Sequence, residues 1–282
     1  MITVVVPTLN SSASLAILLE SLALREPEIH EVVVVDRCSS DDTLSVAKRF
    51  RARVIQGPWN RAEARNVGVR ESTGDPIFFL DADMEIREPI FTNGVTALAH
   101  NDAVIIREVV AFGTNYWARC RSLERDAYFG SLFFESARGF RRDCIERLGG
   151  YNPKLSGLED MDIQARLLEG GYSVTWLKTP IVHHEEEVGL LTYLRKRHQY
   201  AASDEEFSVL HPMFARVLRS PKRRLRAILP NFRRQPLFRL GMALPGLLFI
   251  RGIEWFLRST SSSKDGLIPA SQHHLNRISK GR

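Results

Sequence analysis

Two aspartates directly follow an apolar run in the stretch IFFLDADMEI, which begins at Ile77. Residues i and i+2 of a β-strand point to the same side, so we expect Asp81 and Asp83 to face one point, with little bulk from Ala82 between them. Carboxylate oxygens are ligands that Mg²⁺ and Mn²⁺ prefer, and water and phosphate oxygens can complete the shell. The pair indicates a metal site, although a lone D-x-D also occurs where two acids only solvate the end of a strand.

A second cluster of acids lies in the stretch GLEDMDI at 157–163, where Glu159 and Asp160 begin an expected helix. The helix macrodipole favours acids at this position, which is a purely structural explanation. A carboxylate beside a glycine-containing loop is also well suited to act as a general base. Further along the chain, His183 and His184 end an expected strand, and one of the two is a candidate metal ligand.

Three more polar residues follow or flank the expected strands. Asp36 ends the apolar stretch EVVVVD, where its carboxylate could accept hydrogen bonds from a base or a ribose. The residues after it, RCSSDDT, are typical of turns and helix caps. Arg61 and Arg65 lie four residues apart and therefore on one helix face. They either meet phosphate or form a solvated surface.

These candidates need a scaffold that brings them together. We expect buried strands at the apolar runs 2–8, 31–36, 52–57 and 76–83, with helices between them. Continuous apolar strands that alternate with helices predict an α/β fold with a mostly parallel, Rossmann-like sheet flanked by helices. Ligands of such sheets bind beyond the carboxyl ends of the strands, so the acids should meet at that edge.

The C-terminal third is strongly basic, and it contributes most of the formal net charge of +6. Residues 207–253 contain ten lysines and arginines and no acid, and 237–257 is an apolar segment interrupted by Arg239, Pro245 and Arg251. The segment is too interrupted to span a bilayer. It predicts either a helix that lies on an anionic membrane surface or helices packed on the rest of the protein. The arginines have few interleaved aromatic residues, so no nucleic-acid partner is expected.

The three cysteines are scattered, and the N-terminus has neither a basic region nor a long apolar region. Reduced thiols and the lack of a signal-peptide pattern predict a cytoplasmic protein. The basic C-terminal segment predicts that it is peripheral at the inner face of the cell membrane. We expect three parts: a catalytic unit at 1–200, a basic helical extension at 201–260, and a polar, poorly ordered tail at 261–282.

The order of these motifs resembles that of the family-2 glycosyltransferases of GT-A fold, over roughly residues 1–200. The family's motifs match Pro7-Thr8, the stretch from Asp36 to Thr43, the A-R-N-x-G at 64–68, Asp81-Ala82-Asp83, Glu159-Asp160, and a histidine at 183 or 184. Arg37 stands in place of the usual second acid, Cys38 in place of a usual glycine, and Asn60 in place of the glycine that often precedes A-R-N.

The resemblance implies a role for each matched residue. Asp160 would be the general base and Glu159 would orient the acceptor. Mn²⁺ or Mg²⁺ would be bound by Asp83, Asp81 and one of His183 and His184. The implied nucleotide-binding residues are Pro7, Thr8, Asn10, Asp36, Arg61, Arg65, Asp81 and Ala82.

The implied reaction moves one sugar from a nucleotide-sugar donor, UDP-linked rather than GDP-linked, with inversion. The acceptor would be a saccharide or lipid-linked hydroxyl, or a lipid phosphate, in cell envelope glycan biosynthesis. The chain has no Q-x-x-R-W motif, which favours a single transfer over polymerisation. Two alternatives stay open: a non-catalytic sugar-nucleotide-binding or scaffolding protein, and a nucleotidyltransferase. The second is disfavoured because PTLNSSASL has neither glycine nor lysine.

Overall fold

The computed structural model describes the following residues: 1–26, 28–110, 115–155, 157–184, 189–190, 194–195, 201–232 and 237–261. Residues 262–282 of the expected polar tail lie outside them, as do Arg233 and Arg234 of the basic segment. The division of the chain near residue 200 stays a prediction.

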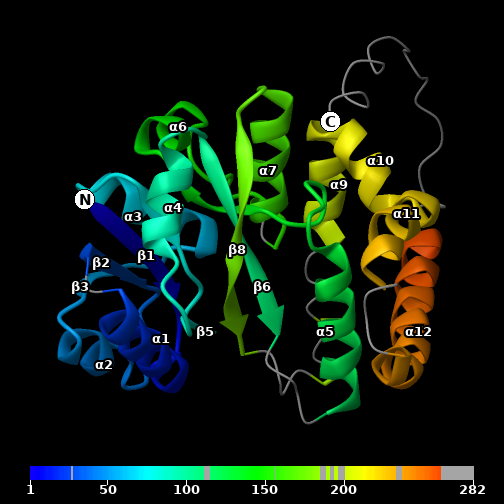
Figure 1. Cartoon of the computed structure of the whole chain (residues 1–282), viewed down its shortest axis with the longest axis horizontal. Coiled ribbons are helices and arrows are strands. Elements are labelled where there is room, and N and C mark those ends of the chain that lie inside the picture. The colour runs from blue at the N-terminus through cyan, green and yellow to red at the C-terminus, as the bar shows by residue number, and fades with distance from the viewer. Residues whose placement is uncertain are drawn as a thin grey trace.

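A single mixed sheet runs through the molecule (Figure 1). In the described residues its eight strands lie in the order β3 (Arg53–Gln56), β2 (Ile29–Asp36), β1 (Ile2–Thr8), β4 (Ile77–Phe79), β7 (Ala137–Phe140), β6 (Ala103–Val110), β8 (Val174–His183) and β5 (Met84–Glu85). The pairs β1–β2, β1–β4, β2–β3 and β6–β8 are parallel, whereas β7 is antiparallel to both neighbours and β5 to β8. The expected α/β fold with a mostly parallel sheet is confirmed.

Helices cover both faces of the sheet because the strands are apolar on both sides. In β1, Val4 and Val6 point into one core and Val5 into the other, as the two-residue period of a strand requires. The first core is closed by α1 (Ser12–Arg25), α2 (Thr43–Arg49) and α4 (Phe91–Leu98), and the second by α3 (Arg61–Glu71), α6 (Arg142–Arg147) and α7 (Glu159–Glu169). The parallel strands β1, β2 and β3 thus present their carboxyl ends along one edge.

One detail of the expected geometry is wrong. The fourth strand ends at Phe79, so Asp81 and Asp83 are not alternate residues of a strand. The Met84 N–H donates to the Asp81 carbonyl oxygen at 3.1 Å, which closes a turn through Ala82. The turn reverses the chain into β5 and sends the two carboxylates to different neighbours.

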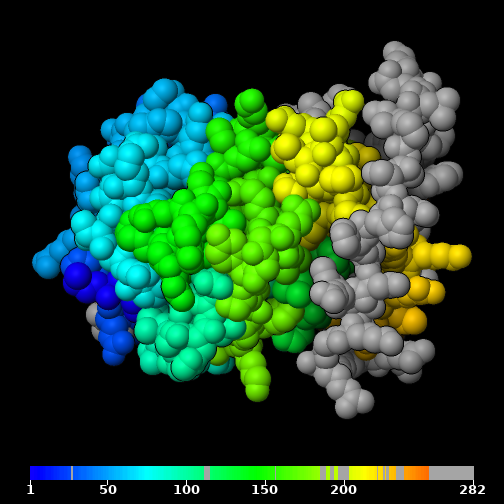
Figure 2. All heavy atoms as spheres, turned by 90° about the horizontal axis from the view of Figure 1, so that it is seen from above, coloured from blue at the N-terminus to red at the C-terminus, as the bar shows by residue number. Residues whose placement is uncertain are grey.

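The C-terminal helices pack beside the sheet rather than apart from it. They are α9 (Ala201–Leu210), α10 (Pro212–Arg219), α11 (Pro221–Phe232) and α12 (Leu237–Ser261), with α5 (Tyr116–Tyr128) between the sheet and α12. Figure 2 shows the yellow helices against the green middle of the chain. Gly246 allows the close contact of α12 with α5, since a Cβ there would lie 2.5 Å from Cys120 Sγ. Within the described ranges, no helix has the length and apolarity to cross a membrane.

Candidate active site

Arg65 lies at the centre of the site and joins two of the predicted acids. Its Nη1 donates to Asp160 Oδ1 at 2.6 Å and its Nη2 to Asp81 Oδ1 at 2.8 Å. The side chain is fully buried, and its Cζ lies 4.9 Å from the centre of the Tyr151 ring. Burial alone would lower the pKa of Arg65, but Asp160 and Asp81 raise it above its ordinary value. Arg65 is therefore a buried cation between the two acidic motifs and not part of a solvated surface.

Local sequence fixes the position of Arg65. Asn60 caps α3: its Oδ1 accepts from the Glu63 N–H at 3.0 Å, and Glu63 Oε2 accepts from the Asn60 N–H at 2.8 Å. Gly68, one turn after Arg65, lies directly on β1, because a Cβ there would be 2.2 Å from Val5 Cγ1. Asparagine thus supplies a complete cap where the family often has glycine, and Gly68 lets the helix approach the sheet.

The neighbouring acids, Glu159 and Asp160, differ in exposure. Glu159 is buried and accepts a hydrogen bond from Arg61 Nε, and Arg65 Nη1 lies 3.7 Å from its Oε1. The Asp160 side chain is 30% exposed. Of the two, Asp160 is the one that a soluble molecule can reach.

Sequence reasoning missed two charged residues of the site, Glu108 and Arg138. Arg138 Nη2 donates to Asp81 Oδ2 at 3.0 Å, and its Nε donates to Glu108 Oε1 at 2.5 Å. Burial would raise the pKa of Asp81, but Arg138 and Arg65 lower it well below its usual value. A detectable signal existed, since Arg138 is the one charged residue of β7 and Glu108, beside Arg107, interrupts the apolar run of β6.

The two candidate histidines point to different partners. His183 Nε2 lies 3.1 Å from Asp83 Oδ1, whereas His184 Nε2 lies 3.1 Å from Glu85 Oε2. Burial would lower the pKa of His183, but hydrogen bonds to Asp83 and Glu108 raise it to about 9. In the antiparallel pair of β5 and β8, Met84 lies opposite His183, which places the neighbouring Asp83 close to His183.

A divalent cation fits part of the expected ligand set. Within the described ranges, no three His, Cys, Asp or Glu side chains form a group that could hold a metal ion by themselves. Both oxygens of Asp81 accept from arginines, so Asp83 and His183 are the two predicted ligands that meet at one point. A carboxylate oxygen and an imidazole nitrogen suit Mn²⁺, provided that the imidazole loses its extra proton and other oxygens complete the shell.

Asp36 lies at the end of β2, beside the end of β1. It is buried, and its Oδ2 accepts from the Ser39 N–H at 2.8 Å and from Gln56 Nε2 at 3.2 Å. Thr8 pairs with Asp36 across the two strands. Among the described residues the Thr8 hydroxyl is buried without a hydrogen-bond partner, which leaves a polar atom for a ligand at this edge.

The loops around this edge use unusual backbone conformations. Asn10 has a φ of 48°, and its Oδ1 accepts from the Ser40 N–H at 2.8 Å. Cys38, at the position where the family usually has glycine, has a φ of 54°. Pro7 lies within β1, and Ala82 is buried in the turn after β4. The predicted nucleotide-binding residues thus lie near the ends of β1, β2 and β4, except for Arg61 and Arg65, which lie on α3.

Comparison with known proteins identifies the family. Residues 3–149 match the sequence profile of glycosyl transferase family 2. The chain belongs to this family. A PGL/p-HBAD biosynthesis glycosyltransferase of Mycobacterium bovis (strain BCG / Pasteur 1173P2) is 29% identical over 231 residues, which cover 77% of this chain and 86% of the relative. The predicted family, and with it a transferase, is confirmed.

A further relative is matched over part of its length, and solved structures share the fold of this chain. An uncharacterized glycosyltransferase of Haemophilus influenzae is 29% identical over 185 residues, and the match covers 60% of this chain but only 62% of that relative. The mannosyltransferase PcManGT from Pyrobaculum calidifontis, in complex with GDP-Man and Mn²⁺, has a TM-score of 0.59 at 20% identity, covering 93% of this chain and 84% of that chain. TarS 1-349 of S. aureus, in complex with UDP, has a TM-score of 0.56 at 20% identity, covering 78% and 72%. The predicted GT-A fold is confirmed.

Proposed function

We infer that this chain transfers one sugar from a nucleotide-sugar donor to an acceptor, with inversion at the anomeric carbon. The observation that carries this proposal is the Arg65 guanidinium, which binds Asp81 and Asp160 at 2.8 and 2.6 Å. It couples the aspartate nearest the expected donor to the candidate base. The partly exposed carboxylate of Asp160 supports a role in activating an acceptor hydroxyl over a non-catalytic role.

Asp160 is the proposed general base. Arg65 occupies one of its carboxylate oxygens and thereby fixes the side chain, while the second oxygen is suited to accept the proton of an attacking hydroxyl. Glu159, buried against Arg61, is a positioning residue that holds this end of α7. The hydroxyl oxygen, once deprotonated, attacks the anomeric carbon, and the bond to the nucleoside diphosphate breaks on the opposite face.

Asp83 and His183 are the proposed ligands of a divalent cation, Mn²⁺ or Mg²⁺. When bound, such an ion neutralises charge that develops on the departing diphosphate. Arg138 and Arg65 hold Asp81 ionised beside this site. The structural neighbours bound to UDP and to GDP-Man with Mn²⁺ support a nucleotide-sugar donor of either kind, and the resemblance favours UDP.

Association with an anionic membrane surface is the second part of the proposal. One face of α12 is apolar and exposed: Phe238 and Leu248 are 68% and 63% exposed, and a Cβ on Gly241 or Gly252 would meet nothing within 4 Å. This outward stripe consists of Phe238, Gly241, Met242, Pro245, Leu248, Phe249 and Gly252. Exposed basic residues on α10 and α11, such as Arg216 and Arg223, provide charge for anionic headgroups.

The variant Asp160→Asn tests the chemistry. We expect sugar transfer to fall by about 100-fold or more, because loss of a general base has effects of this size. Thermal stabilisation by UDP or GDP with Mn²⁺ should persist, because Asp160 does not belong to the proposed nucleotide site. Asp143→Asn, an exposed acid of α6, is the matched control and should transfer sugar normally.

Two results would contradict the proposal. Transfer at the normal rate by Asp160→Asn would remove Asp160 from the role of base. If neither nucleotide stabilised the wild-type protein, the scaffolding alternative would be favoured, since a ligand bound by the folded state must raise its apparent stability.

A further inference from the structure

The imidazole of His183 has a carboxylate at each of its two nitrogens. Its Nε2 lies 3.1 Å from Asp83 Oδ1, and its Nδ1 lies 3.1 Å from Glu108 Oε2. The Asp83 side chain is 44% exposed, whereas that of Glu108 is 18% exposed. Asp83 therefore marks the open side of the histidine, where a cation can enter, and Glu108 lies on its inner side.

Strand pairing places Glu108 beside His183. In the parallel pair of β6 and β8, Val110 lies opposite His183. Glu108 is two residues before Val110 on the same strand, so the two side chains point to the same side of the sheet. The contact between Glu108 and His183 is thus fixed by the backbone hydrogen bonds of two long strands and not by a surface loop.

Two arginines hold the Glu108 carboxylate in place. Arg138 Nε donates to Glu108 Oε1 at 2.5 Å, and Arg125 Nη1 forms an ion pair with Oε2. Arg138 lies at the register shift between β6 and β7, and such bulges re-aim a side chain. Two cations on one carboxylate favour its ionised form and leave it little freedom to turn away from the histidine.

The position of the carboxylate decides which nitrogen of His183 has a free lone pair. An ionised carboxylate can only accept hydrogen bonds, so a contact with Glu108 requires a proton on Nδ1. The lone pair for a cation is then that of Nε2, the nitrogen that faces Asp83. Arg125 Nη1 also lies 3.1 Å from Nδ1, and in the opposite tautomer it would donate to Nδ1 while Nε2 carries the proton. That tautomer has no lone pair toward the cation site.

We propose that Glu108 is a positioning residue for the metal ligand His183: its carboxylate accepts from Nδ1–H and thereby turns the Nε2 lone pair toward the divalent cation. The proposal deepens the proposed function and rests on it, since Asp83 and His183 are the ligands assigned there. Metal-ligating histidines almost always donate their other ring N–H to a partner of this kind, and the partner sets the tautomer and the ring orientation.

The test measures binding of Mn²⁺ to the full-length chain, from the electron paramagnetic resonance signal of free Mn²⁺, with and without UDP or GDP. Glu108→Gln keeps the size of the side chain but removes its charge, and it should weaken Mn²⁺ binding by about tenfold. Glu108→Leu also removes the hydrogen-bond acceptor, and the loss should approach about 100-fold. Asp83→Asn is the reference for a direct ligand and should weaken binding as well.

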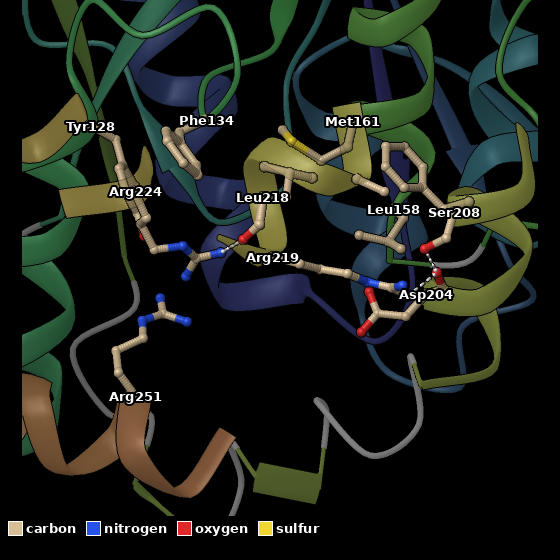
Figure 3. Close-up of a pocket in the computed structure, with 12 residues that line it drawn as sticks. Tyr128, Phe134, Leu158, Met161, Asp204, Ser208, Leu218, Arg219, Arg224 and Arg251 are labelled. Atoms are coloured by element: carbon tan, nitrogen blue, oxygen red, sulfur yellow. Dashed lines mark hydrogen bonds between the residues drawn. The ribbon is translucent and has the colours of Figure 1, made fainter. Parts of the chain in front are cut away.

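A matched control is Glu124→Gln. Glu124 is a similarly buried glutamate, with 11% of its side chain exposed, and it forms an ion pair with Arg251. Arg251 lines a cavity between α7 and the C-terminal helices (Figure 3), and none of the residues that line this cavity belongs to the proposed metal site. Glu124→Gln should bind Mn²⁺ like the wild type, which separates the loss of a buried carboxylate in general from the loss of Glu108.

A double-mutant cycle tests whether Glu108 acts through the imidazole. In the background of His183→Ala, Glu108→Gln should change Mn²⁺ affinity by less than about twofold, because the group that it positions is gone. A tenfold loss that persisted in this background would overturn the proposal, since Glu108 would then act on the cation without the histidine.

A measurement on the wild type carries the test even if the Glu108 variants do not fold. Histidine with a nitrogen isotope at either Nδ1 or Nε2 is incorporated, and electron–nuclear double resonance of bound Mn²⁺ identifies the coordinated atom. The expected result is direct coordination by Nε2. Coordination by Nδ1, or by no histidine nitrogen, would overturn the proposal.

The outcomes also separate this proposal from the proposed function. If Asp83→Asn weakens Mn²⁺ binding but both Glu108 variants bind normally, the cation site stands and the role of Glu108 is refuted. If the wild type binds no Mn²⁺ with either nucleotide, the cation site and the role of Glu108 both fail. If Mn²⁺ binding depends on Glu108 through His183 but no sugar is transferred, Glu108 remains a positioning residue and the proposed reaction fails.

Discussion

At the scale of the residue, Arg65 is the group on which the site depends. It is fully buried and binds Asp81 and Asp160. Arg65→Met should lower the free energy of unfolding by about 3–5 kcal/mol, because it leaves carboxylates without the cation that compensates them. Urea unfolding measures this loss, and Arg70→Met, an exposed arginine of the same helix, should change stability by less than about 0.5 kcal/mol. Equal stability of the two variants would show that Arg65 is not essential to the buried network.

At the scale of the element, His211 joins α7 to the turn between α9 and α10. Its Nε2 lies 2.9 Å from Asp162 Oδ1 and its Nδ1 2.8 Å from Glu169 Oε2, while Arg166 also binds Asp162. Burial would lower the pKa of His211, but these two acids raise it. The charged imidazole therefore stabilises the fold fully below its unfolded pKa of about 6.5, and this contribution is lost as the pH rises through the raised folded pKa.

The variant His211→Gln tests this ion network. The difference in unfolding free energy between the wild type and His211→Gln should be largest below the unfolded pKa of about 6.5 and should shrink as the pH rises through the raised folded pKa of His211. Urea unfolding at a series of pH values gives this difference. His100→Gln, an exposed histidine after α4, should show no such trend. A difference that grew with pH would mean that His211 is held neutral in the folded protein.

At the scale of the whole molecule, strands β1, β2 and β3 lie at one end and α12 lies at the other (Figure 1). The apolar stripe on α12 predicts binding to anionic vesicles, with Met242→Glu or Leu248→Glu reducing co-sedimentation by tenfold or more, since a charge at the headgroup boundary opposes insertion. Leu24→Glu, on α1 at the other end of the molecule, is the control, because that leucine is 70% exposed. If Met242→Glu and Leu248→Glu bound vesicles as well as the Leu24→Glu control does, a membrane-facing role for α12 would be contradicted.

The sequence by itself determined the type and order of the elements around the sheet. The apolar strands that end at Thr8 and Asp36, and the one that precedes the D-A-D motif, could be predicted directly, because a short continuous hydrophobic run is typical of a buried strand. The same motifs gave the family. The helix at Tyr116–Tyr128 was not predicted, because its aromatic and charged residues acquire an inner and an outer face only when α12 packs on it.

Only the tertiary structure decided which charges meet. Asp81 is bound by Arg65, which precedes it by 16 residues, and by Arg138, which follows it by 57 residues. His183 rather than His184 meets Asp83, because strand pairing sends adjacent side chains to opposite faces. The cavity between α7 and the C-terminal helices is lined by residues from six helices. Hydrophobic periodicity is a local property of a sequence, whereas the pairing of a buried charge depends on which distant segment closes over it.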